Sequence, residues 1–198
     1  MTTQHEALWA GKFGDDYTER NRVNWKERVP FWERIMTKIM QPGTLCTVLE
    51  VGCNAGWNLR ALQELPLPIM EYGIDVNRHA LNEARAAGLR VIHSSAMTAG
   101  RQYPGHFDLV FTAGVLIHVP PEDLVPTMKS IAAASSRHVL AIEYEAPEET
   151  EILYQGAGDR LWKRPYGDLY ESIGMELEAT GDAGPGFDNC TYWLMRQP

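Results

Sequence analysis

The stretch VLEVGCNAGWNL, residues 48–59, decides the fold of this 198-residue chain. The apolar, β-branched run at 47–51 is typical of a buried strand, and 59–65 has the pattern of a helix. Gly52 and Gly56 lie in the turn between them, where the lack of a Cβ lets the backbone bend sharply and approach a ligand. This order of strand, glycine-rich turn and helix predicts a doubly wound α/β sheet.

The rest of the chain repeats the alternation of strands and helices. Apolar runs bounded by turn residues predict four more strands, at 71–76, 89–93, 106–112 and 138–144. Helical patterns fall between them, at 78–87 and 121–134. Such alternation predicts a parallel sheet with right-handed crossovers. Two final runs predict an antiparallel pair of strands at the sheet edge, at 175–180 and 191–196, joined by a loop at 181–189 that is rich in glycine and proline.

Acidic and polar side chains at the first two strand ends indicate the kind of ligand. Glu50 precedes the first glycine, and Asn54 replaces the middle glycine of a dinucleotide-binding turn. A buried carboxylate and a polar side chain suit a ligand with ammonium and hydroxyl groups better than a pyrophosphate. Asp75 lies roughly 20 residues beyond the turn, where an acidic residue binds ribose hydroxyls.

Three blocks of the chain carry a resemblance to a known family. They are EVGCNAG at 50–56, GIDVN at 73–77 and FDLVFTAGVLIHVPPEDL at 107–124. They resemble the core of the class I S-adenosylmethionine (SAM) methyltransferases. The resemblance implies a Rossmann-like fold with a mostly parallel seven-stranded sheet and helices on both faces. It also implies one SAM-binding domain over 1–198, with a helical lid at 1–40 and an active-site cover at 145–175.

Longer blocks resemble a narrower group, the pseudaminic acid biosynthesis-associated methylases. They are WAGKFGDDYTERN at 9–21, GVLIHVPPEDL at 114–124 and YQGAGDRLWKRPY at 154–166. The resemblance extends from about Trp9 to Arg196. Some proteins that look like this group are azetidine-2-carboxylate synthases, which use the same fold to cyclise SAM.

The resemblance implies a set of cofactor-binding residues and no metal. The amides from Gly52 to Gly56 are expected to hold the methionine part of SAM, and Asp75 the ribose. Glu50 is expected either to anchor the turn or to accept from the SAM ammonium group. The full expected set is Arg20, Trp25, Glu50, Gly52, Asn54, Gly56, Asn58, Asp75, Val76, Ser95, Ala96, Met97 and Thr112.

The amino-terminal block and the end of the fifth strand supply the expected catalytic residues, Tyr17, Asn21 and Tyr144. Tyr17, Arg20 and Asn21 are spaced to share one face of a helix. Arg20 is expected to bind the SAM carboxylate, and Tyr17 or Trp25 to lie over the sulfonium. An ordinary amphipathic helix that packs its aromatics into the core is the alternative.

Four residues are expected to bind the substrate: His118, Tyr154, Arg160 and Arg164. The arginines would suit an acidic sugar or a carboxylate, although surface salt bridges explain them equally well. Packing is the favoured alternative for His118.

Composition narrows the classes of partner. The net charge of −8 and the pI of about 5.2 argue against nucleic acid. The three cysteines form no C-x-x-C pair, so a reducing cytoplasm is the expected location and Cys53 is expected to pack rather than react. The amino terminus does not resemble a signal peptide, and no apolar run approaches the length of a membrane span. A small molecule is the expected partner.

Three functions follow as hypotheses. The first is methyl transfer from SAM to a small polar acceptor, which needs alignment and desolvation more than acid–base chemistry. The second is cyclisation of SAM to azetidine-2-carboxylate with release of methylthioadenosine. The third is a SAM-binding module without catalysis.

Overall fold

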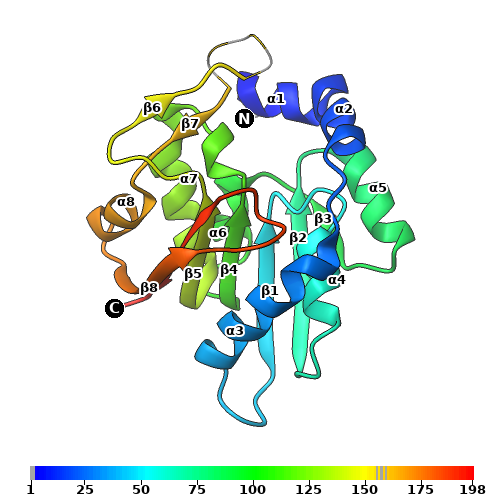
Figure 1. Cartoon of the computed structure of the whole chain (residues 1–198), viewed down its shortest axis with the longest axis vertical. Coiled ribbons are helices and arrows are strands. Elements are labelled where there is room, and N and C mark those ends of the chain that lie inside the picture. Colours follow the sequence, from blue (N-terminus) through cyan, green and yellow to red (C-terminus); the bar gives the residue numbers. More distant parts are fainter. Residues whose placement is uncertain (1–2, 155, 157, 159) are drawn as a thin grey trace.

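A mixed seven-stranded sheet organises the molecule (Figure 1). The computed structural model describes residues 3–154, 156, 158 and 160–198. The strand order is β3-β2-β1-β4-β5-β9-β8. Their bounds are β1 Cys46–Val51, β2 Ile69–Asp75, β3 Val91–His93, β4 Phe107–Ala113, β5 Ser135–Glu143, β8 Glu176–Asp182 and β9 Thr191–Arg196. Strands β1 to β5 pair in parallel, whereas β9 runs antiparallel to both β5 and β8.

Helices cover both faces of this sheet. Their bounds are α1 Gln4–Ala10, α2 Lys12–Arg20, α3 Val29–Ile39, α4 Trp57–Gln63, α5 Arg78–Ala86, α6 Ala99–Gln102, α7 Pro121–Ala134 and α8 Tyr166–Ser172. Short 3-10 turns occur at η1 Trp25–Arg28, η2 Ala96–Thr98 and η3 Leu116–His118, and a small hairpin pairs β6 Thr150–Glu151 with β7 Trp162–Lys163. Helices α3 and α4 pack on one face, and α6, α7 and α8 on the other.

The period of the buried residues explains why α3 lies against the sheet. Phe31, Trp32, Ile35 and Ile39 fall on one side of that helix and are buried with the side chains of β1, β4 and β5. Burying each such side chain contributes about 1.5–3 kcal/mol. The predicted helical lid at 1–40 is therefore too long, because α3 belongs to the core.

Helices α1 and α2 do cover one end of the sheet (Figure 1, blue), beside α5. Thr3 and Glu6 form a reciprocal capping box that starts α1. The side-chain amide of Asn77, before α5, donates to the Trp9 carbonyl at 3.0 Å and to Asp15 at 2.9 Å. These bonds fix the amino-terminal helices over the carboxyl ends of β1 and β2.

The predicted elements agree with the structure except for the shortest ones. The bounds of α7 and β9 coincide with the predicted 121–134 and 191–196. Strand β8 continues to Asp182, into the predicted loop at 181–189. Helix α8 and the β6–β7 hairpin were not predicted within 145–175. Helices this short are stable only through tertiary packing, and α8 buries Tyr166 against Trp193, with ring centroids 5.7 Å apart.

Candidate functional site

A cavity of about 320 Å³ lies at the carboxyl ends of β1, β2, β4 and β5, beneath the amino-terminal helices. Glu50, Asp75 and Tyr144 reach it from the sheet, and Tyr17 from α2. The β8–β9 loop adds Phe187, Asp188 and Cys190. The predicted residues that line it are Tyr17, Asn21, Glu50, Gly52, Asn54, Asn58, Asp75, Val76, Ala96, Met97, His118 and Tyr144. The sheet edge, the glycine turn and the helical cover thus meet at one place.

The glycine turn approaches the loop after β4 closely. Gly52 has φ +73°, and a Cβ there would lie 2.5 Å from the Val115 side chain. The turn's amides are already used inside the protein: those of Gly52 and Cys53 donate to the Ile74 carbonyl at 2.8 and 3.0 Å, and that of Gly56 donates to the Cys53 carbonyl at 2.8 Å. The amide of Ala55 donates to the Asn54 side chain, and that of Asn54 to Asp75. The prediction that these amides hold a ligand is therefore corrected: the turn offers its side chains and carbonyl groups instead.

Glu50 is the buried carboxylate of the site. It is 3% exposed, and its Oε1 accepts from the Asn58 side-chain amide at 2.6 Å. Its Oε2 has no hydrogen-bond partner among the described residues. Burial raises the pKa of Glu50 to about 8, although the Asn58 bond and the nearby Arg28 charge oppose that rise. A buried oxygen without a partner is costly, so a ligand that donates to it would gain affinity.

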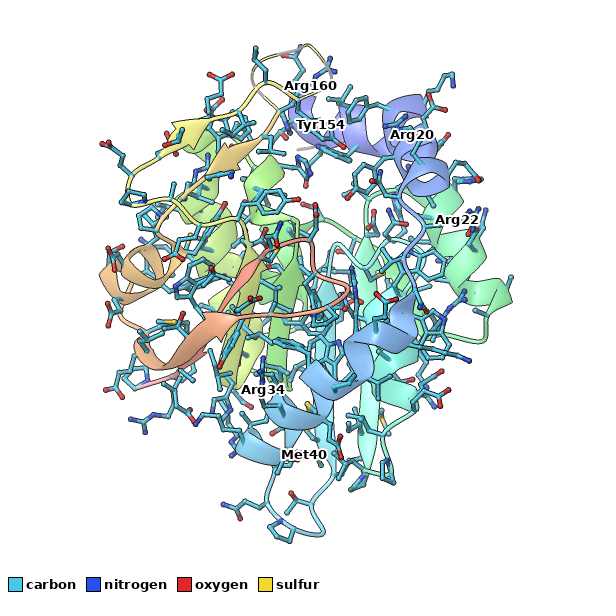
Figure 2. All side chains as sticks on the ribbon, viewed as in Figure 1. Arg20, Arg22, Arg34, Met40, Tyr154 and Arg160 are labelled. Carbon is cyan, nitrogen blue, oxygen red and sulfur yellow. The ribbon has the colours of Figure 1, made fainter. Side chains whose placement is uncertain are left out.

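Arg28, at the end of η1, is the arginine that lines the cavity. Its Nη1 donates to Asn58 Oδ1 at 3.0 Å, and its Nε to the Gly186 carbonyl at 2.9 Å. Asn58 therefore links Arg28 to Glu50. The predicted Arg20 is exposed and does not line the cavity, and Figure 2 shows it on the outer part of α2. Arg28, and not Arg20, therefore lies where a ligand in the cavity could meet it.

Asp75 ends β2 and lines the cavity as predicted. Its Oδ2 accepts from the Asn54 amide at 2.8 Å, and its Oδ1 from the Asn77 amide at 2.7 Å. Burial raises its pKa, and these backbone bonds oppose the rise. A carboxylate oxygen has two lone pairs, so Asp75 can hold the turn and still accept from ligand hydroxyl groups.

Two tyrosines from segments far apart in the sequence face the cavity. Tyr17 comes from α2 and Tyr144 follows β5. Burial raises the pKa of Tyr17 to about 12, and burial together with an Asp188 hydrogen bond raises that of Tyr144. Both hydroxyl groups therefore stay protonated at neutral pH. Asn21 caps the end of α2, and its side-chain amide donates to the Tyr17 carbonyl at 3.0 Å.

His118, at the end of η3, has a fixed tautomer. Its Nδ1 donates to the Arg160 carbonyl at 2.6 Å, and burial lowers its pKa to about 4. Its ring lies 4.5 Å from Trp9 and 5.4 Å from Tyr154, centroid to centroid. His118 is therefore a neutral imidazole within an aromatic cluster, and it also lines the cavity.

The remaining predicted substrate residues do not line the cavity. Tyr154 and Arg160 lie beside the amino-terminal helices in Figure 2, and both contact the Phe13 ring, Arg160 at 5.0 Å. Arg164 is fully buried, with Nε 2.7 Å from Glu149 and Nη1 2.9 Å from the Leu116 carbonyl. The prediction that Arg164 binds substrate is wrong, because its side chain cannot reach a ligand.

Four further predicted cofactor residues lie outside the cavity lining. Trp25 is half-buried against the α3 side of the core. Gly56, with φ +78°, begins α4 and packs against Leu89. The Ser95 hydroxyl donates to Glu6, and Thr112 is buried within β4. Cys53 is buried and its pKa is well above the usual value, as expected for a packing residue.

Several residues of the site were not predicted from the sequence. They are Glu6, Trp9, Arg28, Asn77, Asp123, Phe187 and Asp188. Beside the predicted Ser95, Ala96 and Met97, the structure adds an acidic residue from α1, because Glu6 accepts a hydrogen bond from the Ser95 hydroxyl. Most of these residues come from segments distant in sequence, so no local motif indicates them. For Asn77, the GIDVN block was the available signal.

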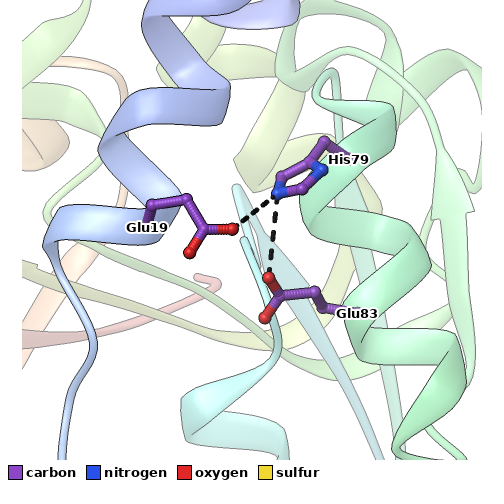
Figure 3. A group of neighbouring side chains, drawn as sticks. All are labelled: Glu19, His79 and Glu83. Atoms are coloured by element: carbon purple, nitrogen blue, oxygen red, sulfur yellow. Dashed lines mark hydrogen bonds and ion pairs between the residues drawn. The ribbon is translucent and has the colours of Figure 1, made fainter.

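A second polar cluster lies on the outer surface, between α2 and α5 (Figure 3). His79 Nε2 is 3.0 Å from Glu19 and 3.7 Å from Glu83, and the three ligand atoms lie within 4.8 Å of one another. Arg22 also pairs with both glutamates, at 2.8 and 3.1 Å. We interpret the cluster as an ionic contact between the two helices, because an arginine already occupies both carboxylates.

Comparison with known proteins agrees with this geometry. A family model described as a methyltransferase domain matches residues 48–137. No curated protein matches the chain. Solved structures match over nearly the whole length, including magnesium protoporphyrin IX methyltransferase from Synechocystis PCC 6803 with bound SAM, at 15% identity and a TM-score of 0.70, covering 99% of this chain and 98% of that one.

Two other solved structures are similar. One is 1,6-didemethyltoxoflavin-N1-methyltransferase from Burkholderia thailandensis, at 14% identity and a TM-score of 0.74, covering 100% of this chain and 91% of that one. The other is a complex of the Haloferax volcanii Trm112 methyltransferase activator with a methyltransferase, at 14% identity and a TM-score of 0.66, covering 100% and 99%.

The strand order and the similar solved structures show that the chain has the fold of the class I SAM-dependent methyltransferases, and residues 48–137 match the methyltransferase-domain model. The predicted fold class is confirmed. Membership of the pseudaminic acid group stays a prediction. Among the described residues, no helix is long and apolar enough to cross a membrane.

Proposed function

We propose that this chain binds SAM in the cavity and transfers the SAM methyl group to a small molecule. The observation that carries this proposal is the buried Glu50 Oε2, which has no hydrogen-bond partner within the part of the chain that the structure describes; Glu50 lines the cavity together with Arg28. An α-amino acid group carries one ammonium and one carboxylate. Glu50 would accept from the ammonium and Arg28 would bind the carboxylate. Asp75 would accept from the ribose hydroxyls.

The residues of the cavity fit the chemistry of methyl transfer. SAM supplies a methyl group that its sulfonium has already activated. The aromatic faces of Tyr17 and Tyr144 attract a cation and exclude water, and Asn21 offers a neutral hydrogen-bonding group. Neither tyrosine serves as a base at neutral pH, because its pKa is raised. These three residues would therefore act by alignment and desolvation.

The similar structures favour a small-molecule acceptor. The Burkholderia enzyme is crystallised with 1,6-didemethyltoxoflavin and S-adenosylhomocysteine. The Synechocystis enzyme also occurs with bound S-adenosylhomocysteine. We further propose that 1–198 is one domain, in which α1, α2 and part of 145–175 cover the site, and that it works in the cytoplasm without nucleic acid or membrane. The negative net charge supports the exclusion of nucleic acid.

Incubation of the purified protein with SAM tests the proposal. S-adenosylhomocysteine that forms only after an acceptor is added would support methyl transfer. Methylthioadenosine from SAM alone would instead indicate cyclisation to azetidine-2-carboxylate. Tight SAM binding without any product would indicate a non-catalytic module. Chromatography with mass detection distinguishes the adenosyl products.

Replacement of Asp75 with alanine should weaken SAM binding by about 1–3 kcal/mol, through the loss of hydrogen bonds to a charged group. The same change releases the amides of Asn54 and Asn77, so the melting temperature should also fall. Asp75→Asn keeps a hydrogen-bonding side chain and should lose less affinity than Asp75→Ala. Calorimetric titration of both folded variants checks this. Unchanged affinity in Asp75→Ala would remove Asp75 from the ribose role.

A further inference from the structure

Acidic side chains outnumber basic side chains around the cavity. Five carboxyl groups line it, those of Glu6, Glu50, Asp75, Asp123 and Asp188, and even with Glu50 protonated they outnumber Arg28, the one arginine or lysine among its described lining residues. The histidines that line it are His5 and His118, and burial lowers the pKa of both. The cavity therefore favours cationic over anionic molecules.

The proposed binding of SAM accounts for only part of this negative charge. Glu50 and Arg28 would pair with the amino acid group, and Asp75 would accept from hydroxyls. Glu6 already accepts from the Ser95 hydroxyl and the Thr3 amide. No group of the bound SAM, as proposed, pairs with Asp123 or Asp188. The single positive charge of the sulfonium does not require two carboxylates.

The two arginines expected to bind an acidic acceptor are not available to one. Glu149 and the Leu116 carbonyl already bind Arg164, whose side chain is fully buried. Arg160 packs on Phe13 outside the cavity lining. An acidic sugar or a carboxylate would therefore meet Asp188 without a compensating cation.

Asp188 is oriented by Tyr144, because its carboxylate accepts a hydrogen bond from the Tyr144 hydroxyl. Its backbone and that of Asn189 have φ +50° and +58°, a left-handed conformation that aspartate and asparagine adopt more readily than other non-glycine residues. Lys163 lies 5.6 Å from the Tyr144 ring but does not line the cavity.

We propose that the nucleophile of this enzyme is a cationic amine and that Asp188, oriented by Tyr144, binds it. The inference rests on the proposed function. An ammonium group would donate to Asp188 and then transfer one proton to that carboxylate, which leaves a neutral amine. The amine lone pair forms the new nitrogen–carbon bond, and the carbon–sulfur pair stays on sulfur as the thioether leaves. Asp188 is exposed, so it can return the proton to solvent.

The amine comes from a separate acceptor, because the proposed function places the α-ammonium of SAM at Glu50. An external amine yields S-adenosylhomocysteine and requires a second substrate. Methylthioadenosine from SAM alone would contradict this, because it forms only when the α-amine of SAM is the nucleophile.

The binding test uses three probes of equal chain length: butylamine, 1-butanol and butyrate. Each is titrated by calorimetry or NMR into protein saturated with S-adenosylhomocysteine. Wild-type protein should bind butylamine at least about tenfold more tightly than the other two, as expected for a hydrogen bond to a charged group. Asp188→Asn should reduce this preference to about twofold or less. Asp168→Asn, on α8 and outside the cavity lining, should leave it unchanged.

A second variant tests whether Tyr144 positions Asp188. Tyr144→Phe keeps the ring but releases Asp188, so the preference for butylamine should fall several-fold while S-adenosylhomocysteine affinity changes little. The inference fails if wild-type protein binds butyrate or butanol as tightly as butylamine, or if Asp188→Asn keeps the preference. Failure to bind S-adenosylhomocysteine would instead overturn the proposed function, so this affinity is measured first.

Discussion

Replacement of Glu149 with alanine should destabilise the protein by about 3 kcal/mol, although Glu149 is itself exposed. The change removes the carboxylate that pairs with Arg164 Nε at 2.7 Å. The Arg164 side chain has 0% exposure, so its charge would remain buried, in contact with the Leu116 carbonyl and the Trp162 ring but without a counter-charge from Glu149. The value is at the low end for broken buried pairs because the Glu149 side chain is 45% exposed. Urea denaturation measures the change in free energy of unfolding.

Two further variants make this experiment specific. Glu148→Ala removes an exposed neighbouring carboxylate and should change stability by less than about 0.5 kcal/mol. Arg164→Leu combined with Glu149→Ala should recover part of the loss, because the buried charge is then gone. A Glu149→Ala variant as stable as Glu148→Ala would show that Arg164 does not depend on this pair.

Arg164 also illustrates what the sequence could not predict. In the sequence it stands beside Lys163 in a basic segment, which is typical of an exposed surface or an anion site. Its burial depends on the β6–β7 hairpin and on η3, 48 residues earlier. Local patterns do not report such contacts. The sequence therefore correctly placed an arginine close to the cavity, but it predicted the wrong role for Arg164.

The sheet was predictable because its signal is local. The apolar runs that form β1, β4 and β5 are continuous, as buried parallel strands require, and the glycine turn fixes the first crossover. The residues at the strand ends, Glu50 and Asp75, followed from that placement. The residues on the opposite side of the cavity could not be predicted in this way. For example, Arg28 donates to the Gly186 carbonyl, which lies 158 residues further along the chain.

The second large expected effect is a dependence of the free energy of unfolding on pH, caused by Glu50. Burial raises the pKa of Glu50 to about 8, so the folded protein without ligand keeps a proton that the unfolded chain loses near pH 4.5. The folded state then binds more protons between these values, and stability should fall as the pH rises from about 5 to 8. The slope for one such group approaches about 1.4 kcal/mol per pH unit.

Glu50→Gln isolates this contribution. Burial also raises the pKa of Glu143 to about 7, so the variant should keep some decline with pH. The difference in free energy of unfolding between Glu50→Gln and wild type should shift steadily in favour of the variant from pH 5 to 8. Urea denaturation at each pH measures it. A difference that does not change with pH would show that Glu50 ionises normally in the folded protein.

The same proton should control ligand binding. SAM needs Glu50 as a carboxylate to accept from its ammonium, so binding below pH 8 must expel the Glu50 proton. SAM affinity should therefore rise with pH, by up to about tenfold per unit between pH 6 and 7.5. Higher pH is avoided because α-amino groups lose their own proton near pH 8. Calorimetry in two buffers of different ionisation enthalpy should detect close to one proton released per SAM bound at pH 6.5.

Glu50→Gln should bind SAM more weakly than wild type by about 1.5–3 kcal/mol at pH 7.5, the contribution of a hydrogen bond to a charged group. The deficit should shrink as the pH falls toward 6, because wild type must then release a proton that the variant does not carry. The variant should also release no Glu50 proton on binding. Equal affinity and equal proton release in the two proteins would mean that Glu50 only anchors Asn58 and the glycine turn. The unpaired Oε2 would then need another explanation, and the proposed placement of the amino acid group would be wrong.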